Sequence, residues 1–221
     1  MTDPELRLGE DPAAELGAAL GSRALEGGTI VLTGGSSIGR AYEHAAATGD
    51  WSRSSVWWGD ERCVPPDDER SNYGLARRTL LDRLAVLPEV HRIHGELEPA
   101  LAAAEYEREL DGVHINLLLL GLGPDGHIAS LFPGSPQLAE HEGLVTSGPA
   151  GLAPWVDRVT LTLPALLLAE LIWFLVTGPD KAEAVRRSFR EPVTDAVPAS
   201  LLREGSAPIV VFLDQAAASG L

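Results

Sequence analysis

The feature that most constrains this chain is a run of four leucines, Leu117–Leu120, followed by a Gly-Leu-Gly-Pro-Asp-Gly segment and His127. An uninterrupted apolar run bounded by glycines is typical of a strand that is buried on both faces. Pro124, Asp125 and Gly126 are residue types that close a type I turn. Open α/β sheets bind ligands at the carboxyl ends of their strands. The sequence therefore predicts that His127 lies just past a central strand, where it is a candidate for chemistry.

The rest of the chain alternates apolar strands with helices. Asp11 and Pro12 predict the cap and first residue of a helix that a glycine ends. Residues 158–162 alternate with period two, which favours a strand with one polar face. We therefore expect one domain, residues 1–221, with a three-layer, mostly parallel, doubly wound α/β fold that is Rossmann-like and has helices on both faces. The other predicted strands are residues 29–33, 54–58, 115–120, 171–177 and 208–213, and the other predicted helices are residues 36–47, 75–84, 100–110, 179–189 and one that Pro164 opens.

Composition limits the partners of the protein. The net charge of −15 argues against nucleic acid or an anionic membrane as a partner. Cys63 is the only cysteine, which rules out an internal disulfide and fits a reducing cytoplasm. No secretory signal is visible, and the longest apolar stretch, residues 165–176, is short for a membrane span and contains Glu170. We expect a soluble, cytoplasmic protein.

A glycine-rich loop, Thr-Gly-Gly-Ser-Ser at residues 33–37, joins a predicted strand to the next helix. Gly34 and Gly35 allow backbone N–H groups to approach a ligand, and a helix N-terminus favours negative charge. Ser36 and Ser37 stand at that helix start. The segment predicts an anion-binding loop, and an ordinary turn capped by Ser36 is the alternative.

Two glycine patterns come close to nucleotide-binding motifs. No Gly-Lys-Ser/Thr follows residues 33–37, so the loop is not a Walker P-loop, and no Tyr-x-x-x-Lys completes a short-chain dehydrogenase pattern. Gly121, Gly123 and Gly126 match G-x-G-x-x-G. However, Pro124 occupies the turn, and the motif lies in mid-chain instead of opening the first βαβ unit. We therefore do not expect a dinucleotide site.

Charged side chains follow the predicted strand at residues 54–58. Asp60 and Arg62 share the end of that strand, and a guanidinium fork suits a phosphate, so a site is favoured over a solvated loop. Lys181 falls in the first turn of a predicted helix, where the macrodipole disfavours a cation unless an anion is near. A solvated surface lysine is the alternative. Arg158 is a further candidate for the same anion.

The other histidines carry no metal signature. His91 and His94 have helical i, i+3 spacing, but no cysteine or carboxylate set completes a metal site around them. We expect structural or solvent-exposed roles for these side chains, which are His44, His91, His94, His114 and His141.

Taken in order, the motifs resemble those of the 6-phosphogluconolactonases. The resemblance implies hydrolysis of 6-phosphoglucono-δ-lactone to 6-phosphogluconate in the oxidative pentose phosphate pathway. Relatives usually continue Gly-Gly-Ser-Thr-Pro in the first loop, whereas this chain has Ser37 and Ile38, which bears on the loop shape more than on the phosphate site. The motifs that carry the resemblance are Thr-Gly-Gly-Ser-Ser at 33–37, Trp-Trp-Gly-Asp-Glu-Arg to Ser-Asn-Tyr-Gly at 57–74, Gly-Leu-Gly-Pro-Asp-Gly-His-Ile-Ala-Ser-Leu-Phe-Pro-Gly-Ser at 121–135, Arg-Val-Thr-Leu-Thr-Leu-Pro-Ala-Leu at 158–166 and Gly-Pro-Asp-Lys at 178–181.

The glucosamine-6-phosphate deaminases are a sister family with a similar fold and the same Asp-Gly-His element. They typically continue toward Ala-Phe-Asn-Glu-Pro, whereas residues 129–133 of this chain are Ala-Ser-Leu-Phe-Pro. The resemblance therefore favours a lactonase over a deaminase or isomerase. A non-catalytic sugar-phosphate sensor is the other alternative, and the presence of both His127 and Asp125 argues against it.

The lactonase resemblance assigns a role to each candidate residue. Lactone hydrolysis needs a water that is deprotonated as it attacks C1. His127 is the expected base, Asp125 orients its ring or holds the turn, and Asp60 lines the lactone side. No cofactor or metal is needed, the expected partner is the small sugar-phosphate lactone, and a monomer is favoured. The expected substrate-binding residues are Gly34, Gly35, Ser36 and Ser37 of the first loop, Arg62, Asn72 of the Ser-Asn-Tyr segment, Lys181, and Arg158 in reserve.

Overall fold

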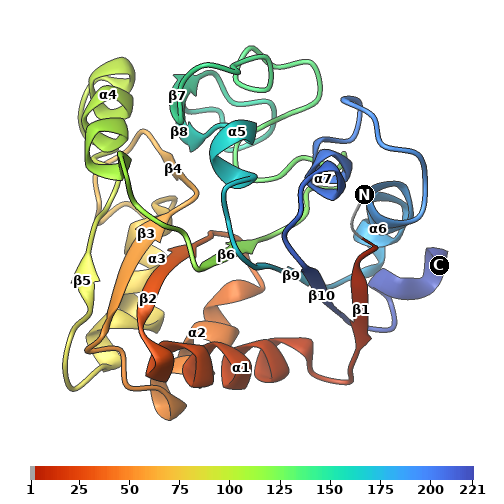
Figure 1. Cartoon of the computed structure of the whole chain (residues 1–221), viewed down its shortest axis with the longest axis horizontal. Coiled ribbons are helices and arrows are strands. Elements are labelled where there is room, and N and C mark those ends of the chain that lie inside the picture. The colour runs from red at the N-terminus through yellow and green to blue at the C-terminus, as the bar shows by residue number, and fades with distance from the viewer. Residues whose placement is uncertain (1–2) are drawn as a thin grey trace.

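The structure, a computed structural model, describes residues 3–221. Its largest element is a seven-stranded sheet in which every pairing between neighbouring strands is parallel. The strands are β1 (Glu5–Leu8), β2 (Gly28–Leu32), β3 (Ser54–Trp58), β5 (Glu89–Val90), β6 (Leu117–Leu120), β9 (Ile172–Val176) and β10 (Ile209–Leu213). Their order across the sheet is β1-β10-β9-β6-β2-β3-β5 (Figure 1). The predicted parallel sheet is confirmed.

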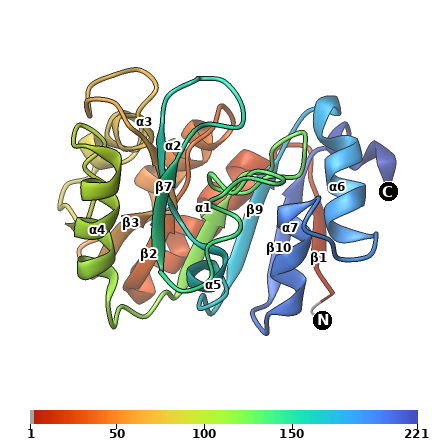
Figure 2. The same ribbon diagram turned by 90° about the horizontal axis from the view of Figure 1, so that it is seen from above.

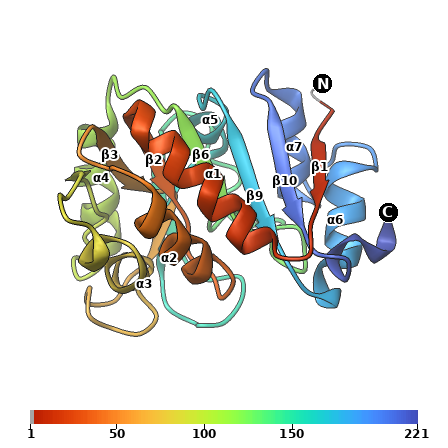
Figure 3. The same cartoon turned by 90° about the horizontal axis from the view of Figure 1, so that it is seen from below.

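Helices cover both faces of this sheet, as expected. Figures 1 and 3 show α1 and α2 across one face, and Figures 1 and 2 show α4, α5 and α7 over the other. None of the helices in residues 3–221 combines the length and apolarity that a membrane-spanning helix needs. The helices are α1 (Pro12–Glu26), α2 (Ile38–Thr48), α3 (Asn72–Thr79), α4 (Pro99–Leu110), α5 (Leu163–Leu166), α6 (Ala182–Phe189) and α7 (Pro198–Leu201), with 3-10 turns η1 (Leu81–Arg83), η2 (Pro179–Lys181), η3 (Leu202–Glu204) and η4 (Ala217–Gly220).

A second, antiparallel sheet lies over the same face as α4. Its strands are β4 (Asp60–Arg62), β7 (Val145–Gly148) and β8 (Arg158–Leu161), in the order β4-β8-β7. The strand predicted at 158–162 is β8, and its polar residues Arg158 and Thr160 share one face, although all four residues of the strand are buried. Strand β8 contacts α4 and is paired on both edges. Its polar face therefore lies inside the protein.

Local signals explain where the helices begin. Asp11 caps α1 by accepting a hydrogen bond from the Ala14 N–H at 3.1 Å, as its position before Pro12 predicts. The helix predicted at 75–84 starts earlier, at Asn72, because the Ser71 hydroxyl accepts the Gly74 N–H at 2.9 Å and caps α3. Sequence patterns did not indicate β1, β4, β5, β7 or α7, which are all four residues or shorter.

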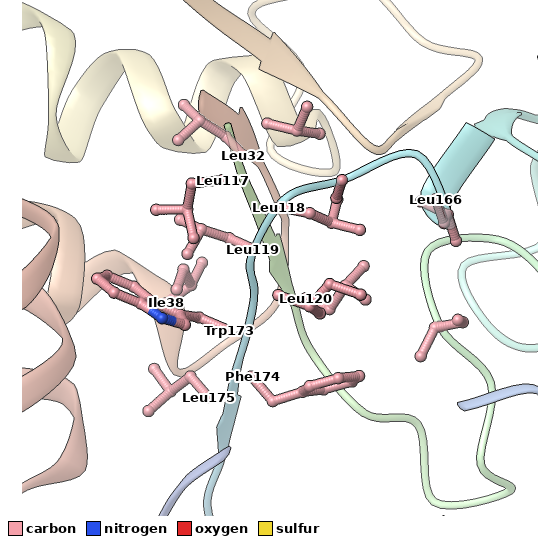
Figure 4. Close-up of a cluster of buried hydrophobic side chains, with 14 of the residues drawn as sticks. Leu32, Ile38, Leu117, Leu118, Leu119, Leu120, Leu166, Trp173, Phe174 and Leu175 are labelled. Atoms are coloured by element: carbon pink, nitrogen blue, oxygen red, sulfur yellow. The ribbon is translucent and has the colours of Figure 1, made fainter. Parts of the chain in front are cut away.

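Strand β6 is central and buried on both faces. Figure 4 shows Leu117 and Leu119 on the side of Ile38, and Leu118 and Leu120 on the side of Leu166. Each of the four leucines is at most 1% exposed. The leucine run therefore acts as the sequence predicts, with alternate side chains filling the two layers that enclose the sheet.

The order of the strands places a crevice beside β6. The chain leaves β2 toward β3 on one side, whereas it leaves β6 toward β9 on the other. The loops after β2 and β6, residues 33–37 and 121–127, therefore separate at the carboxyl ends of two neighbouring strands. In an open α/β sheet this topological switch point is where ligands bind.

Candidate active site

A cavity of about 270 Å³ opens at this crevice. The glycine loop after β2, the turn after β6 and one face of the small sheet all contribute to its walls. A second cavity of about 100 Å³ adjoins it beside the glycine loop. The larger cavity is lined by these predicted site residues: Gly34, Gly35, Asp60, Arg62, Asn72, His127, Arg158 and Lys181.

Two buried tyrosines hold the ends of strands that lead into the cavity. The Tyr42 hydroxyl donates to the Thr33 carbonyl at 2.7 Å and accepts the Thr33 N–H at 2.9 Å. The Tyr106 hydroxyl forms the same pair of bonds with Trp58, at 3.0 and 2.8 Å. Burial raises the pKa of both phenols, so each remains a donor. These hydrogen bonds therefore fix the backbone at the carboxyl ends of β2 and β3, next to the cavity.

The turn after β6 carries a His127–Asp125 pair. The Gly126 N–H donates to the Gly123 carbonyl at 3.0 Å, which closes the predicted turn. Asp125 Oδ1 lies 2.6 Å from His127 Nδ1 and 3.1 Å from the His127 backbone N. Burial raises the pKa of Asp125, but its hydrogen bond and proximity to His127 outweigh burial and lower it. The carboxylate is therefore ionised at neutral pH and accepts a hydrogen bond from the Nδ1–H group.

That tautomer leaves Nε2 of His127 as the basic nitrogen. Nε2 has no hydrogen-bond partner within residues 3–221, and the side chain lines the cavity. The ring packs against Phe132, with 4.6 Å between centroids. A Cβ on Gly123 would lie 2.0 Å from Nδ1, so only glycine there leaves room for the ring. The local fold thus holds one imidazole nitrogen toward the cavity.

We expect Asp125→Asn to lower kcat by about 10- to 100-fold, the worth of one hydrogen bond to a charged group. An asparagine amide can donate to Nδ1 and so favour the tautomer that protonates Nε2. Steady-state kinetics at saturating substrate measures the effect. Asp111→Asn is the matched control, because Asp111 is exposed, follows α4 and is not among the residues that line the cavity. Equal kcat values for both variants would contradict the orienting role of Asp125.

Two guanidinium groups lie side by side on the small sheet. Arg62 and Arg158 are cross-strand partners on β4 and β8, and both line the cavity. Arg62 donates to the Arg70 carbonyl, while its buried Nε has no partner in the described chain. Arg158 donates to three backbone carbonyls of residues 152–156. Burial and the charge of Arg62 both lower the Arg158 pKa. Two like charges held this close favour binding of an anion.

The glycine loop and Lys181 also line the site. Ser37 Oγ lies 2.6 Å from Thr177 Oγ1, which ties the loop to the end of β9. Ser36 and Ser37 line the adjoining cavity instead of the larger one, and Lys181 lines both. Helix α2 begins at Ile38 with Ser37 as its N-cap residue, so the expectation that Ser36 would be the cap is wrong.

Lys181 also differs slightly from its predicted place. It ends η2 and is the N-cap residue of α6, which begins at Ala182, instead of lying in the first turn of a longer helix. Its ammonium is 3.5 Å from Asp180, and its side chain is 22% exposed. Lys181 therefore lies at a helix N-terminus with Asp180 as a nearby anion, and its side chain lines the cavity.

Glu61 is a buried residue whose function the sequence analysis did not foresee. Its carboxylate accepts the backbone N–H groups of Arg62, Asn72 and Tyr73 and the hydroxyl of Ser71, at 2.7 to 2.9 Å. Burial raises the Glu61 pKa, and these four donors oppose that rise. Glu61 thus joins the start of α3 to β4. Its position inside the Asp-Glu-Arg motif was the available signal.

Comparisons with known proteins identify the family of the chain. The family model described as glucosamine-6-phosphate isomerases/6-phosphogluconolactonase matches residues 7–211. This chain belongs to that family. The 6-phosphogluconolactonase of Streptomyces coelicolor is 37% identical over 214 residues, which cover 87% of this chain and 82% of that protein. The human 6-phosphogluconolactonase is 37% identical over 234 residues, covering 92% of this chain and 89% of that one.

Solved structures of the family have the same fold. The 6-phosphogluconolactonase of Trypanosoma brucei superposes with a TM-score of 0.87 and 27% identity, and the match covers 100% of both chains. A monomeric glucosamine-6-phosphate deaminase also superposes with a TM-score of 0.83, but at 18% identity it shows the shared fold alone. The predicted resemblance to the lactonase branch of the family is confirmed.

Proposed function

We propose that this chain hydrolyses 6-phosphoglucono-δ-lactone to 6-phosphogluconate. The observation that carries the proposal is one cavity with an Asp125-oriented imidazole, His127, and three cationic side chains, Arg62, Arg158 and Lys181. The lactone carries an electrophilic carbonyl and a phosphate at opposite ends of one sugar. A base and a cationic pocket in the same cavity suit both ends of it.

In the proposed mechanism His127 acts as the general base. Nε2 takes a proton from a water molecule while the water oxygen bonds to C1 and the carbonyl oxygen becomes an oxyanion. The oxyanion then collapses, the bond from C1 to the ring oxygen breaks, and the imidazolium returns the proton to that oxygen. Asp125 stabilises the imidazolium formed between these steps. The chain's own residues therefore supply orientation and proton transfer.

The phosphate end is assigned to the cationic walls. Arg62 and Lys181 provide charged donors, and the backbone N–H groups of the loop at 34–37 provide neutral ones. Arg158 lies beside Arg62 and adds to the positive electrostatic potential of the pocket, although its own N–H groups donate to backbone carbonyls of residues 152–156. Anchoring the phosphate places C1 near His127 and makes the attack effectively intramolecular.

We expect Arg62→Ala and Lys181→Ala each to weaken binding of 6-phosphogluconate by about 10- to 100-fold, because each removes a charge-assisted hydrogen bond. Calorimetric titration of 6-phosphogluconate measures the dissociation constant, and kcat at saturating lactone should change little. Arg77→Ala is the control, since Arg77 lies on α3 with a solvent-exposed pair to Asp82. Reduced kcat with unchanged binding would contradict the phosphate assignment.

An assay with two substrates tests the activity itself. We expect acid release from freshly prepared 6-phosphoglucono-δ-lactone to exceed the spontaneous rate measured without protein. Glucosamine 6-phosphate should give no ammonia. Ammonia release without lactone hydrolysis would establish the deaminase alternative, and binding without turnover of either compound would establish a sensor.

Three further statements belong to the same proposal. We propose that the chain forms one domain over residues 1–221, that it acts as a monomer, and that it works in the cytoplasm. Size-exclusion chromatography with light scattering tests the monomer. Three rice relatives of the chain are named as chloroplastic.

A further inference from the structure

Ser130 connects the turn that carries His127 to the small sheet. Asp60 and Thr160 are cross-strand partners on β4 and β8. Ser130 contacts both: its hydroxyl donates to Asp60 Oδ2 at 2.6 Å, and its backbone N–H donates to Thr160 Oγ1 at 3.2 Å. Ser130 is 1% exposed and lines the cavity. The two halves of the site, which come from different sheets, are therefore joined at this residue.

The backbone around Ser130 is constrained. Ala129 has φ +47°, in the left-handed region that residues with a side chain rarely adopt. The Leu131 N–H donates to the Ile128 carbonyl at 2.9 Å, which closes a tight turn around Ala129 and Ser130. Such a conformation persists only when its surroundings determine it. The turn directs the Ser130 hydroxyl at Asp60.

Asn72 holds the other oxygen of the same carboxylate. Its Nδ2 donates to Asp60 Oδ1 at 3.0 Å and to the Asp60 carbonyl at 2.9 Å. Glu61 fixes Asn72 in turn by accepting its backbone N–H at 2.7 Å. A Cβ on Gly34 would lie 1.8 Å from Asn72 Oδ1, so the amide is packed directly against the glycine loop. Asp60 is thus held from two sides by buried neutral donors.

This arrangement makes Asp60 a fixed acceptor. Its side chain is buried, it forms no ion pair in the described part of the chain, and it lines the cavity. A carboxylate has about four lone-pair sites, and two of them are occupied here. The unfilled sites of a buried charge call for a donor from the ligand. In a sugar lactone the available donors are the ring hydroxyl groups.

We propose that Asp60 accepts a hydrogen bond from one ring hydroxyl of the lactone, and that Ser130 is the positioning residue that aims it. The inference rests on the proposed function and deepens it by naming how the cavity recognises the sugar. Asp60 then acts in specificity, whereas the base is His127. Ser130 acts through Asp60 and does not contact the reacting atoms.

Three substrate analogues test the proposal: the 6-phosphorylated δ-lactones that lack the 2-, 3- or 4-hydroxyl. The quantity compared is the ratio of kcat/KM for the full lactone to kcat/KM for each analogue. For the wild-type chain we expect this ratio to be about 10 to 100 for one of the three analogues, because that analogue loses one charge-assisted hydrogen bond. Ser130→Ala should reduce that one ratio to about threefold and leave the other two ratios unchanged. Asp60→Asn, which keeps the shape of the side chain, should reduce the same ratio.

Ser188→Ala is the matched control, because Ser188 is a fully buried serine on α6, away from the cavity. It should leave all three ratios at their wild-type values. Should Ser130→Ala not fold, as judged by thermal unfolding, Asp60→Asn decides the question alone. If both variants lost kcat/KM equally for the full lactone and for all three analogues, the role of these residues would be merely structural and the inference would be overturned. A wild-type chain that hydrolyses all three analogues equally well would also overturn it. A chain with no lactonase activity at all would instead refute the proposed function.

Discussion

Replacing His127 with alanine is expected to lower kcat for lactone hydrolysis by about a hundredfold to ten-thousandfold, the range that a positioned general base contributes. Nε2 is the nitrogen that remains basic, because Nδ1 is 2.6 Å from the ionised Asp125. Without the ring, water must attack C1 unaided. The phosphate contacts lie on other elements, so the dissociation constant for 6-phosphogluconate should stay within about threefold of the wild-type value.

The measurement is a lactonase assay corrected for spontaneous ring opening, paired with calorimetric titration of 6-phosphogluconate. His114→Ala makes the same substitution at a histidine just before β6, at the opposite end of that strand, where it pairs with Glu170 in solvent. This control should keep full activity. An unchanged kcat in His127→Ala would remove His127 from the mechanism.

The second large effect is on stability: Glu61→Ala should lower the free energy of unfolding by about 2–4 kcal/mol, because buried donors lose their acceptor. Four donors, from Arg62, Ser71, Asn72 and Tyr73, converge on this carboxylate. Its removal leaves the N–H groups of Asn72 and Tyr73 at the start of α3 without an acceptor and loosens Asn72, which holds Asp60. We therefore expect kcat/KM to fall together with stability.

Urea unfolding monitored by tryptophan fluorescence gives the free energy of unfolding directly. Glu69→Ala, at an exposed position between β4 and α3, is the matched control and should change stability by less than about 0.5 kcal/mol. If both variants unfold at the same urea concentration, the four hydrogen bonds to Glu61 contribute nothing measurable, and its structural role is wrong.

Much of the main sheet could be predicted from the sequence. The strands at β2, β3, β6, β9 and β10 and the helix α1 appear within a residue or two of their expected places. Each is signalled by its own residues, through apolar runs, caps and glycines. The shorter elements β1, β4, β5 and β7 were not predicted. Such short strands are recognised only where an apolar run or an alternation stands out, as in β6 and β8, and the partners of β1 and β4 lie far along the chain.

The site divides in the same way. The sequence by itself determined the His127 turn, because Gly123, Asp125, Gly126 and His127 interact within five residues. It also placed charged residues at strand ends. Only the tertiary structure brought Arg62 beside Arg158 and Ser130 onto Asp60, because these contacts depend on the register of an antiparallel sheet that no local pattern encodes. Neighbouring residues determine local hydrogen bonds and backbone angles, whereas the packing of the two sheets determines the shape of the cavity.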